Sequence, residues 1–186
     1  IGWTNEKGHT KKMDFIDRRR AYFHAAAIRD IYVDLPPEDY EEGKCGKLVQ
    51  SMYGTRDAAQ NWEYEYSDSM IEVGFKKGKA SPCVFWNSER NLKVVVNGDD
   101  FIILGYQMDL DWFKRVIMEQ FEVKFRGRMG PEPQDDKSIR ILNRVIEWSE
   151  EGITYEAGQR HAEIILKGMD FDEKTKDVTT PGTKPT

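Results

Sequence analysis

The fold of this 186-residue chain is decided by the stretch Val94-Val95-Val96-Asn97-Gly98-Asp99-Asp100-Phe101-Ile102-Ile103-Leu104. Two apolar runs of strand length lie on either side of a short polar segment. Asn-Gly between such runs is a strong signal for a tight β-hairpin turn. Continuous apolar runs of this length are typical of strands in the middle of a sheet, with both faces partly covered. The stretch therefore predicts an antiparallel hairpin near the centre of a sheet.

Shorter patterns on both sides of the hairpin predict the remaining elements. Strands are expected at residues 13–17, 31–33, 47–49, 83–86, 92–96, 101–104, 139–148 and 152–156, and helices at 20–28, 57–73, 109–121 and 158–169. The helix at 57–73, capped by Asp57 and ended by Gly74, is the clearest, because its apolar residues recur every three or four positions. These residues are Ala58, Trp62, Tyr66, Met70 and Val73. Helices mixed with mainly antiparallel strands indicate the α+β class.

The composition excludes several classes of protein. Aromatic residues make up 12% of the chain, whereas disordered segments are poor in large apolar side chains. No apolar run approaches the ~18 residues that a membrane span needs, and the start lacks a secretion signal. Cys45 and Cys83 match no metal-ligand spacing and are expected to be reduced thiols. The chain starts at Ile1 and ends in a Pro/Thr-rich stretch, so we expect a piece of a longer polyprotein.

The net charge of −5 does not suit a protein that binds nucleic acid, because phosphates call for a basic surface. The charge is unevenly distributed, however. Residues 1–29 carry seven Lys or Arg against three acids, and residues 30–72 carry three bases against eleven acids. The first segment is suited to face phosphates while the second faces water. Each run taken alone is also explained as an ordinary solvated face.

Two adjacent carboxylates at the hairpin tip, Asp99 and Asp100, are the sharpest chemical feature. Carboxylate oxygens are the hard ligands that Mg²⁺ prefers. A two-metal phosphoryl-transfer site needs a further oxygen ligand from another strand, and Asp17, at the end of the run Phe15-Ile16, is the candidate. Two alternatives stay open at this point. The Asp pair is only an acidic turn, or Asp17 is only the N-cap of the helix expected after it.

Six motifs, in order and with similar gaps, resemble those of copia-type retrotransposon reverse transcriptases. They are DRRRAYF at 17–23, IYV at 31–33 with PPE at 36–38, SMYGTRDAAQNW at 51–62, GF at 74–75 with ASPCVF at 80–85, NGDD at 97–100 in place of the YxDD box, and ILNRV at 141–145. Gln159 and the VTTP segment at 178–181 resemble the end of the family's domain. The resemblance covers nearly the whole chain after about residue 13. Six ordered motifs are far more specific than one Asp pair.

The resemblance implies a polymerase palm, which is a small antiparallel, ferredoxin-like sheet with helices on one face. The chain would be a right-hand polymerase fold lacking most of the fingers. Residues 1–12 would be a remnant of the fingers or a linker, and residues 13–157 the reverse transcriptase palm. Residues 158–186 would be the start of the thumb or connection and a linker. The rest of the fingers and the RNase H domain would be supplied by other parts of the polyprotein.

The resemblance also implies RNA-directed DNA synthesis, in which deoxynucleoside triphosphates are added to the 3′ end of a DNA primer on an RNA template. Asp17, Asp99 and Asp100 would hold two Mg²⁺ ions, replaceable by Mn²⁺, that activate the primer hydroxyl and bind the triphosphate. Tyr22 would lie under the sugar and exclude a 2′-hydroxyl, unless it is an ordinary core aromatic. Asp57, with its neighbour Arg56, would help seat the nucleotide and template. Such a protein would be intracellular, in the cytoplasm within a virus-like particle or in the nucleus, with no membrane partner.

The chain departs from the family at Asp57 (usually Gln), Asn97 (the YxDD tyrosine) and Arg18 (usually apolar). An acid at position 57 adds repulsion toward phosphate, and a buried, unpaired Arg18 would be costly. The main alternative is therefore an inactive relic that keeps the palm fold. A nucleotide cyclase palm is weaker, because it leaves residues 53–62 unexplained. An RNA-binding ferredoxin-like sheet needs exposed aromatics on its central strands, which residues 94–96 do not offer.

Overall fold

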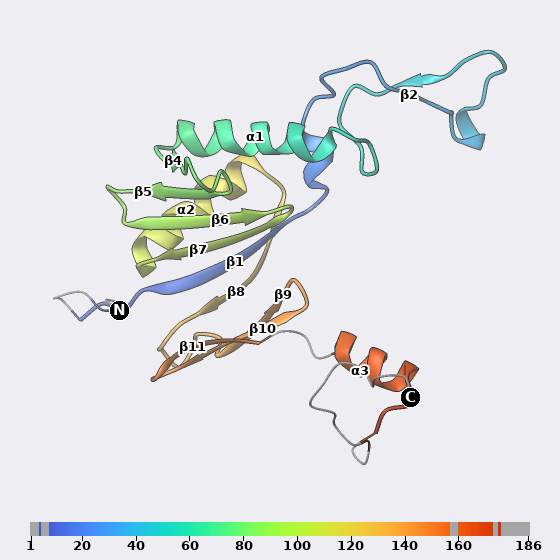
Figure 1. The fold of residues 1–186 in the computed structure, drawn as a ribbon. Coiled ribbons are helices and arrows are strands. Elements are labelled where there is room, and N and C mark those ends of the chain that lie inside the picture. Colours follow the sequence, from blue (N-terminus) through green and yellow to red (C-terminus); the bar gives the residue numbers. More distant parts are fainter. Residues whose placement is uncertain (1–3, 5–7, 157–159, 173–174, 176–186) are drawn as a thin grey trace. The chain divides into compact units, whose positions relative to one another are not determined.

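The computed structural model describes residues 4, 8–156, 160–172 and 175, and the chain divides into two compact units, residues 1–137 and 138–186. The larger unit contains a six-stranded sheet, a two-stranded arm and two α-helices, and the smaller unit contains three strands and one α-helix (Figure 1). The expected α+β class is confirmed. None of the helices in the described part of the chain is long and apolar enough to cross a membrane.

The six-stranded sheet has the order β4-β5-β6-β7-β1-β8, and every neighbouring pair is antiparallel. Its strands are β1 (Lys12–Arg18), β4 (Lys76–Lys77), β5 (Val84–Asn87), β6 (Leu92–Asn97), β7 (Asp100–Gly105) and β8 (Val123–Met129). β6 and β7 form the predicted central hairpin, and β1 lies between β7 and β8. The sequence prediction missed β4 and β8. In β8 the alternation of apolar Val123 and Phe125 with basic Lys124 and Arg126 was a signal for a half-buried strand.

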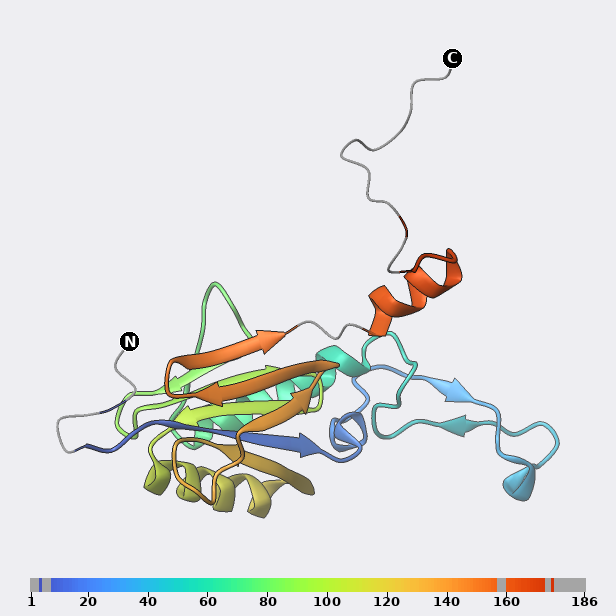
Figure 2. The same ribbon diagram turned by 90° about the horizontal axis from the view of Figure 1, so that it is seen from below.

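Two helices, α1 (Ala58–Glu72) and α2 (Gln107–Gln120), pack on the same face of the sheet (Figures 1 and 2). The hydrophobic core lies between them and the strands. Along β6 the buried residues are Leu92, Val94 and Val96, whereas Lys93 and Val95 are exposed. Because successive side chains of a strand point to opposite faces, β6 has one covered face and one exposed face. The expectation that both faces are partly covered is therefore wrong for β6, and it is confirmed for β7 (Asp100–Gly105), where Ile102 and Leu104 on the second face are half-buried.

The predicted buried face of α1 is confirmed. Its buried apolar residues are Ala58, Trp62, Tyr66 and Met70, and Val73 packs beside them. The helix ends as expected at Gly74, whose φ of 89° is a left-handed conformation that suits glycine. The Gly74 and Phe75 amides donate to the carbonyls of Ile71 (2.9 Å) and Met70 (3.0 Å), which satisfies two carbonyls of the last turn.

Residues 20–28 do not form a helix, so that prediction is wrong. Only one 3-10 turn, η1 (Ala21–His24), is present, with Arg20 in the left-handed region (φ 56°) and Ala25 extended. The backbone that follows this turn bonds to a distant segment instead, and the amide of Ser51 donates to the carbonyl of Ala25 (2.8 Å). A long-range backbone pairing therefore overrides the helix propensity of the alanines.

A two-stranded arm lies between η1 and α1 in the sequence. It pairs β2 (Tyr32–Val33) with β3 (Gly46–Lys47), and η2 (Pro37–Asp39) lies between them. The strand expected at 31–33 is confirmed, and the one expected at 47–49 lies one residue earlier and is shorter.

The smaller unit contains β9 (Ser138–Ile141), β10 (Arg144–Ser149), β11 (Gly152–Glu156) and α3 (Arg160–Gly168). The single strand expected at 139–148 is wrong, because Leu142 and Asn143 both have positive φ (50° and 58°), as a two-residue hairpin turn requires. The strand at 152–156 is confirmed, and so is a helix over most of 158–169. Gln159 and the segment at 178–181 lie outside the described residues.

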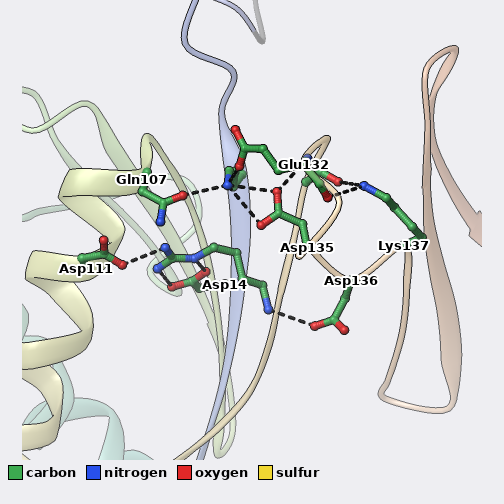
Figure 3. Close-up of polar contacts among 10 residues, drawn as sticks. Asp14, Gln107, Asp111, Glu132, Asp135, Asp136 and Lys137 are labelled. Atoms are coloured by element: carbon green, nitrogen blue, oxygen red, sulfur yellow. Dashed lines mark hydrogen bonds and ion pairs between the residues drawn. The ribbon is translucent and has the colours of Figure 1, made fainter.

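One end of β1 is anchored by a buried lysine. Lys12 is only 2% exposed and contacts Gln107 Oε1 at 2.7 Å and the Asp135 carboxylate at 2.9 Å. It also pairs with Glu132 (Figure 3). Pairing and hydrogen bonding offset the cost of burying the Lys12 charge. These contacts tie β1 to α2 and to the loop after β8.

A second ion pair fixes β1 against β8 and α2. The Nε and Nη2 atoms of Arg128 donate to the two oxygens of Asp14 at 2.6 and 2.7 Å, and Nη1 donates to Asp111 at 2.7 Å (Figure 3). Burial raises the pKa of Asp14, and Arg128 opposes that rise. A bidentate pair of this kind fixes orientation as well as distance. It therefore supports the strand register on which the candidate site depends.

Candidate active site

The register of the central strands brings two predicted site residues together. Asp17 of β1 is the direct antiparallel partner of Asp100, the first residue of β7. Asp100 also closes the β6–β7 hairpin opposite Asn97, so that only Gly98 and Asp99 form the turn. Gly98 supplies the positive φ (61°) that such a turn needs at its first central position. Asp17 is a strand residue and not the N-cap of a helix.

The three acidic residues lie at the edge of the core. Ile16 and Phe101 are buried in the core beneath α1 and α2. Because neighbouring residues of a strand alternate between faces, the side chains of Asp17 and Asp100 lie on the face opposite these helices. Lys124 of β8 is paired with Asp17 and therefore shares that face. A row of carboxylates and a lysine thus crosses three adjacent strands.

The hairpin tip is held by contacts from other elements. The Trp62 indole Nε1, from α1, donates to the Gly98 carbonyl at 2.9 Å. The backbone amide of Arg18 donates to the Asp99 carbonyl at 2.8 Å. The turn is therefore fixed from both sides, which gives the Trp of the SMYGTRDAAQNW segment a role in shaping the acidic turn.

The structure adds Tyr53 to the site, a residue that the sequence prediction quoted only as part of a motif. Its hydroxyl donates to Asp99 Oδ2 at 3.1 Å. Its ring stacks on that of Tyr22, with centroids 4.3 Å apart and an interplanar angle of 26°. Burial and the negative charge of Asp99 raise the pKa of Tyr53, so the hydroxyl remains a donor at neutral pH. Tyr22, half-buried against the core, is thereby linked to Asp99.

The electrostatics of Asp100 reflect its crowded position. Burial raises the pKa of Asp100, and the charges of Asp17 and Asp99 raise it further. Arg126 Nη1 lies 3.3 Å from Asp100 Oδ1 and opposes this rise. A nearby cation favours the ionised form of a carboxylate that lies next to two other carboxylates. Arg126 was missed because its strand, β8, was not predicted.

The other two predicted site residues, Arg56 and Asp57, lie at the start of α1. Both oxygens of Asp57 accept hydrogen bonds from Arg29, at 3.0 and 3.1 Å, which lowers the pKa of Asp57. Its side chain therefore does not cap the helix, although Asp57 occupies the capping position. Arg29 offsets the negative charge that was expected to repel phosphate. Arg56 is exposed, and neither residue bonds to the three carboxylates.

Arg18 is buried in the core on the opposite side of β1 from the carboxylates. It is 1% exposed, and none of its three guanidinium nitrogens bonds to a described residue. The guanidinium carbon lies 4.0 Å from the ring centroid of Trp62 and 3.6 Å from that of Phe121. Burial lowers the pKa of Arg18 to about 10. The expectation of a costly buried arginine is met, and two aromatic rings offset part of the cost.

Replacing Arg18 by methionine is expected to stabilise the protein. Exchanging an unpaired buried charge for an apolar side chain of similar length removes the desolvation penalty, and the lost cation–π contacts reduce the gain to about 1–2 kcal/mol. Urea unfolding of the two proteins measures the difference. Arg115, an exposed arginine of α2, provides the control, since Arg115→Met should change the free energy of unfolding little. A destabilised Arg18→Met variant would show that the ring contacts outweigh burial.

The three carboxylates match the chemistry of a magnesium site. They are hard oxygen ligands near adjacent strand ends, and burial together with the charges of Asp17 and Asp99 raises the pKa of Asp100, while Arg126 opposes that rise. In the described part of the chain, no group of three or more acidic, histidine or cysteine side chains is arranged so that it could hold a metal ion. Tyr53 donates a hydrogen bond to one oxygen of Asp99, and Arg126 donates one to an oxygen of Asp100. The three residues fit a divalent cation in donor type and charge, although their side chains are not arranged as a metal site in this structure.

Comparison with known proteins finds one matching family and several similar polyproteins. Residues 6–131 match the model of the family described as reverse transcriptase (RNA-dependent DNA polymerase). The Transposon Ty1-GR3 Gag-Pol polyprotein of Saccharomyces cerevisiae is 30% identical over 138 residues, which are 72% of this chain and 8% of that protein. The Ty1-BR Gag-Pol polyprotein of the same yeast is 30% identical over 128 residues, 65% of this chain and 7% of its own length.

A truncated Ty1-A Gag-Pol polyprotein of the same yeast is 29% identical over 114 residues, 59% of this chain and 9% of its own length. The chain therefore spans less than a tenth of the length of these relatives. No solved structure matches the chain.

Proposed function

The chain belongs to the reverse transcriptase (RNA-dependent DNA polymerase) family, and we propose that it supplies the catalytic palm for RNA-directed DNA synthesis. The resemblance to copia-type enzymes is confirmed by the family match and by the Ty1 relatives. The palm would comprise residues 13–157, with residues 1–12 a remnant of the fingers or a linker. Residues 158–186 would begin the thumb or connection.

The observation that carries this proposal is the direct pairing of Asp17 with Asp100 across adjacent strands, with Asp99 in the turn beside them. Asp17 and Asp99 are far apart in sequence, so nothing local requires this arrangement. In the proposed site these three carboxylates would hold two Mg²⁺ ions. The chemistry that bound ions would supply there is activation of the attacking hydroxyl and stabilisation of the charge on the transferred phosphoryl group.

The protein's own residues position the reactants around the carboxylates. Tyr22, stacked on Tyr53, would lie under the sugar of the incoming deoxynucleotide and exclude a 2′-hydroxyl by contact. Lys124 and Arg126, on β8, would attract the phosphates of the primer or the triphosphate. Arg56, exposed at the start of α1, would contact the triphosphate or template, and Asp57 is held by Arg29 close to it.

The partners of this site would be an RNA template, a DNA primer and deoxynucleoside triphosphates. The remaining fingers and an RNase H domain would come from other parts of a Gag-Pol polyprotein, as the large uncovered share of the Ty1 relatives suggests. Neither a nucleotide cyclase nor an RNA-binding sheet explains the match over residues 6–131.

Primer extension tests the proposed function directly. The chain, joined to fingers and RNase H segments of the polyprotein, should extend oligo(dT) on poly(rA) with dTTP and Mg²⁺. Omitting Mg²⁺ should remove the activity, because the carboxylates by themselves only repel phosphate. A protein that folds but gives no extension with either Mg²⁺ or Mn²⁺ would contradict the proposal.

An inactive relic that keeps the fold is the second candidate, and one contact favours it. The Arg126–Asp100 ion pair already supplies a positive charge where the proposed function needs a metal ion. In a relic, Arg126 would replace the cation as the stabilising partner of the carboxylates. The same extension assay, together with a melting temperature measured with and without Mg²⁺, separates the two candidates. A relic is inactive, and its melting temperature does not respond to Mg²⁺.

A further inference from the structure

Tyr53 connects two residues of the proposed site that lie on different elements. Its hydroxyl donates to one carboxylate oxygen of Asp99, and its ring stacks on Tyr22. A second aromatic, Phe23, packs edge-on against the same ring with centroids 5.6 Å apart. Two aromatic contacts therefore restrict the position of the phenol, although Tyr53 is 42% exposed.

The turn that carries Tyr53 is itself braced. The amide of Thr55 donates to the carbonyl of Met52 at 3.1 Å, and the Thr55 hydroxyl donates to the same carbonyl at 2.7 Å. Just before the turn, Ser51 is buried and accepts a hydrogen bond from Asn61 Nδ2 at 2.9 Å. Gly54 adopts the positive φ (90°) that allows the chain to reverse there. The turn is thus attached to α1 as well as closed on itself.

The backbone of Asp99 is fixed independently of its side chain. Its carbonyl accepts the Arg18 amide, and the preceding carbonyl of Gly98 accepts the Trp62 indole. With the backbone held, the carboxylate retains freedom about its side-chain torsions. Among the residues that the structure describes, the Tyr53 hydroxyl is the group that donates a hydrogen bond to the Asp99 carboxylate. This hydrogen bond therefore restrains rotation of the Asp99 carboxylate, and with it the position of the second oxygen, Oδ1.

We propose that Tyr53 is a positioning residue, which orients the Asp99 carboxylate so that Oδ1 is presented to a divalent cation. This inference rests on the proposed function. Ligand carboxylates need such partners, because an outer hydrogen bond fixes their orientation before the metal binds, and its loss typically weakens metal binding 10- to 100-fold. A neutral phenol suits this role, since it orients the carboxylate without cancelling its charge. Tyr53 touches neither the substrate nor the metal in this arrangement.

A Mn²⁺ titration of this chain, followed by electron paramagnetic resonance, measures the effect without any need for catalysis. Tyr53→Phe removes only the hydroxyl and keeps both ring contacts. We expect its dissociation constant for Mn²⁺ to rise about tenfold or more. Its melting temperature without metal should stay close to that of the wild type, because the lost hydrogen bond lies at the surface. Tyr64→Phe, which removes the hydroxyl of an exposed tyrosine of α1, should bind Mn²⁺ as the wild type does.

Asp99→Asn in the same titration separates failure of this inference from failure of the proposed function. If Asp99→Asn weakens Mn²⁺ binding and Tyr53→Phe does not, Asp99 is a ligand and the role of Tyr53 is wrong. Tighter binding by Tyr53→Phe would also overturn the inference, because it would mean that the phenol competes with the metal. If the wild type binds no Mn²⁺, the proposed metal site fails and the inference fails with it.

Discussion

Asp99→Asn is expected to abolish nucleotide addition in a polymerase built from this chain and its flanking segments. Asparagine has nearly the same shape as aspartate but lacks the negative charge that holds Mg²⁺. We expect kcat to fall roughly 10³-fold or more, on the scale of losing strong electrostatic stabilisation in a transition state. Single-nucleotide incorporation on an RNA template measures this loss. Asp68→Asn, which makes the same exchange at an exposed position of α1, should leave the rate unchanged.

Although Asp99→Asn should abolish activity, it should increase the stability of the folded protein in the absence of metal. The charge of Asp99 raises the pKa of Asp100, so the folded protein without metal contains carboxylates that repel one another. Removing one charge relieves that repulsion, and Asp99→Asn should melt at a higher temperature than the wild type when Mg²⁺ is absent. Mg²⁺ should raise the melting temperature of the wild type more than that of the variant. If Asp99 were only part of an ordinary acidic turn, Asp99→Asn would change neither activity nor stability, because Asn is also a good turn residue.

Trp62→Ala should be among the most destabilising single substitutions in the chain. The indole is 1% exposed and packs edge-on against Tyr66 and Phe121, with ring centroids 5.2 and 5.7 Å apart. Its loss leaves a cavity in the core and should lower the free energy of unfolding by about 3–5 kcal/mol. It also removes the hydrogen bond to Gly98 that holds the acidic turn. Activity should therefore fall even at temperatures where the variant remains folded.

Two further variants separate packing from the hydrogen bond at Trp62. Trp62→Phe keeps an aromatic ring but leaves the Gly98 carbonyl without its donor, so it should be less destabilising than alanine and still impair the turn. Tyr64→Ala, on the exposed side of the same helix, should change the free energy of unfolding by about 0.5 kcal/mol or less. Urea unfolding of all three variants tests the assignment. Similar values for Trp62→Ala and Tyr64→Ala would mean that the buried face of α1 is wrong.

The sequence predicted those elements whose signal is local. The three- and four-residue spacing from Ala58 to Met70 identified the buried face of α1, and Gly74 marked its end. Asn97-Gly98 between apolar runs located the β6–β7 hairpin. Local patterns failed at Ala25, where backbone pairing with Ser51 replaced an expected helix. They failed because a long-range hydrogen bond is not encoded in the segment that it reshapes.

The sequence by itself determined the family, the α+β class and the positions of the acidic residues along the chain. The tertiary structure decided which of those residues meet. The pairing of Asp17 with Asp100 depends on the register of β1, which is fixed by contacts far from both residues. The contacts of Tyr53 with Asp99 and of Arg126 with Asp100 likewise join segments that no local pattern relates. The physical reason is that periodicity specifies which face of an element is buried, whereas the partner across that face is set only when the strands align and the core packs.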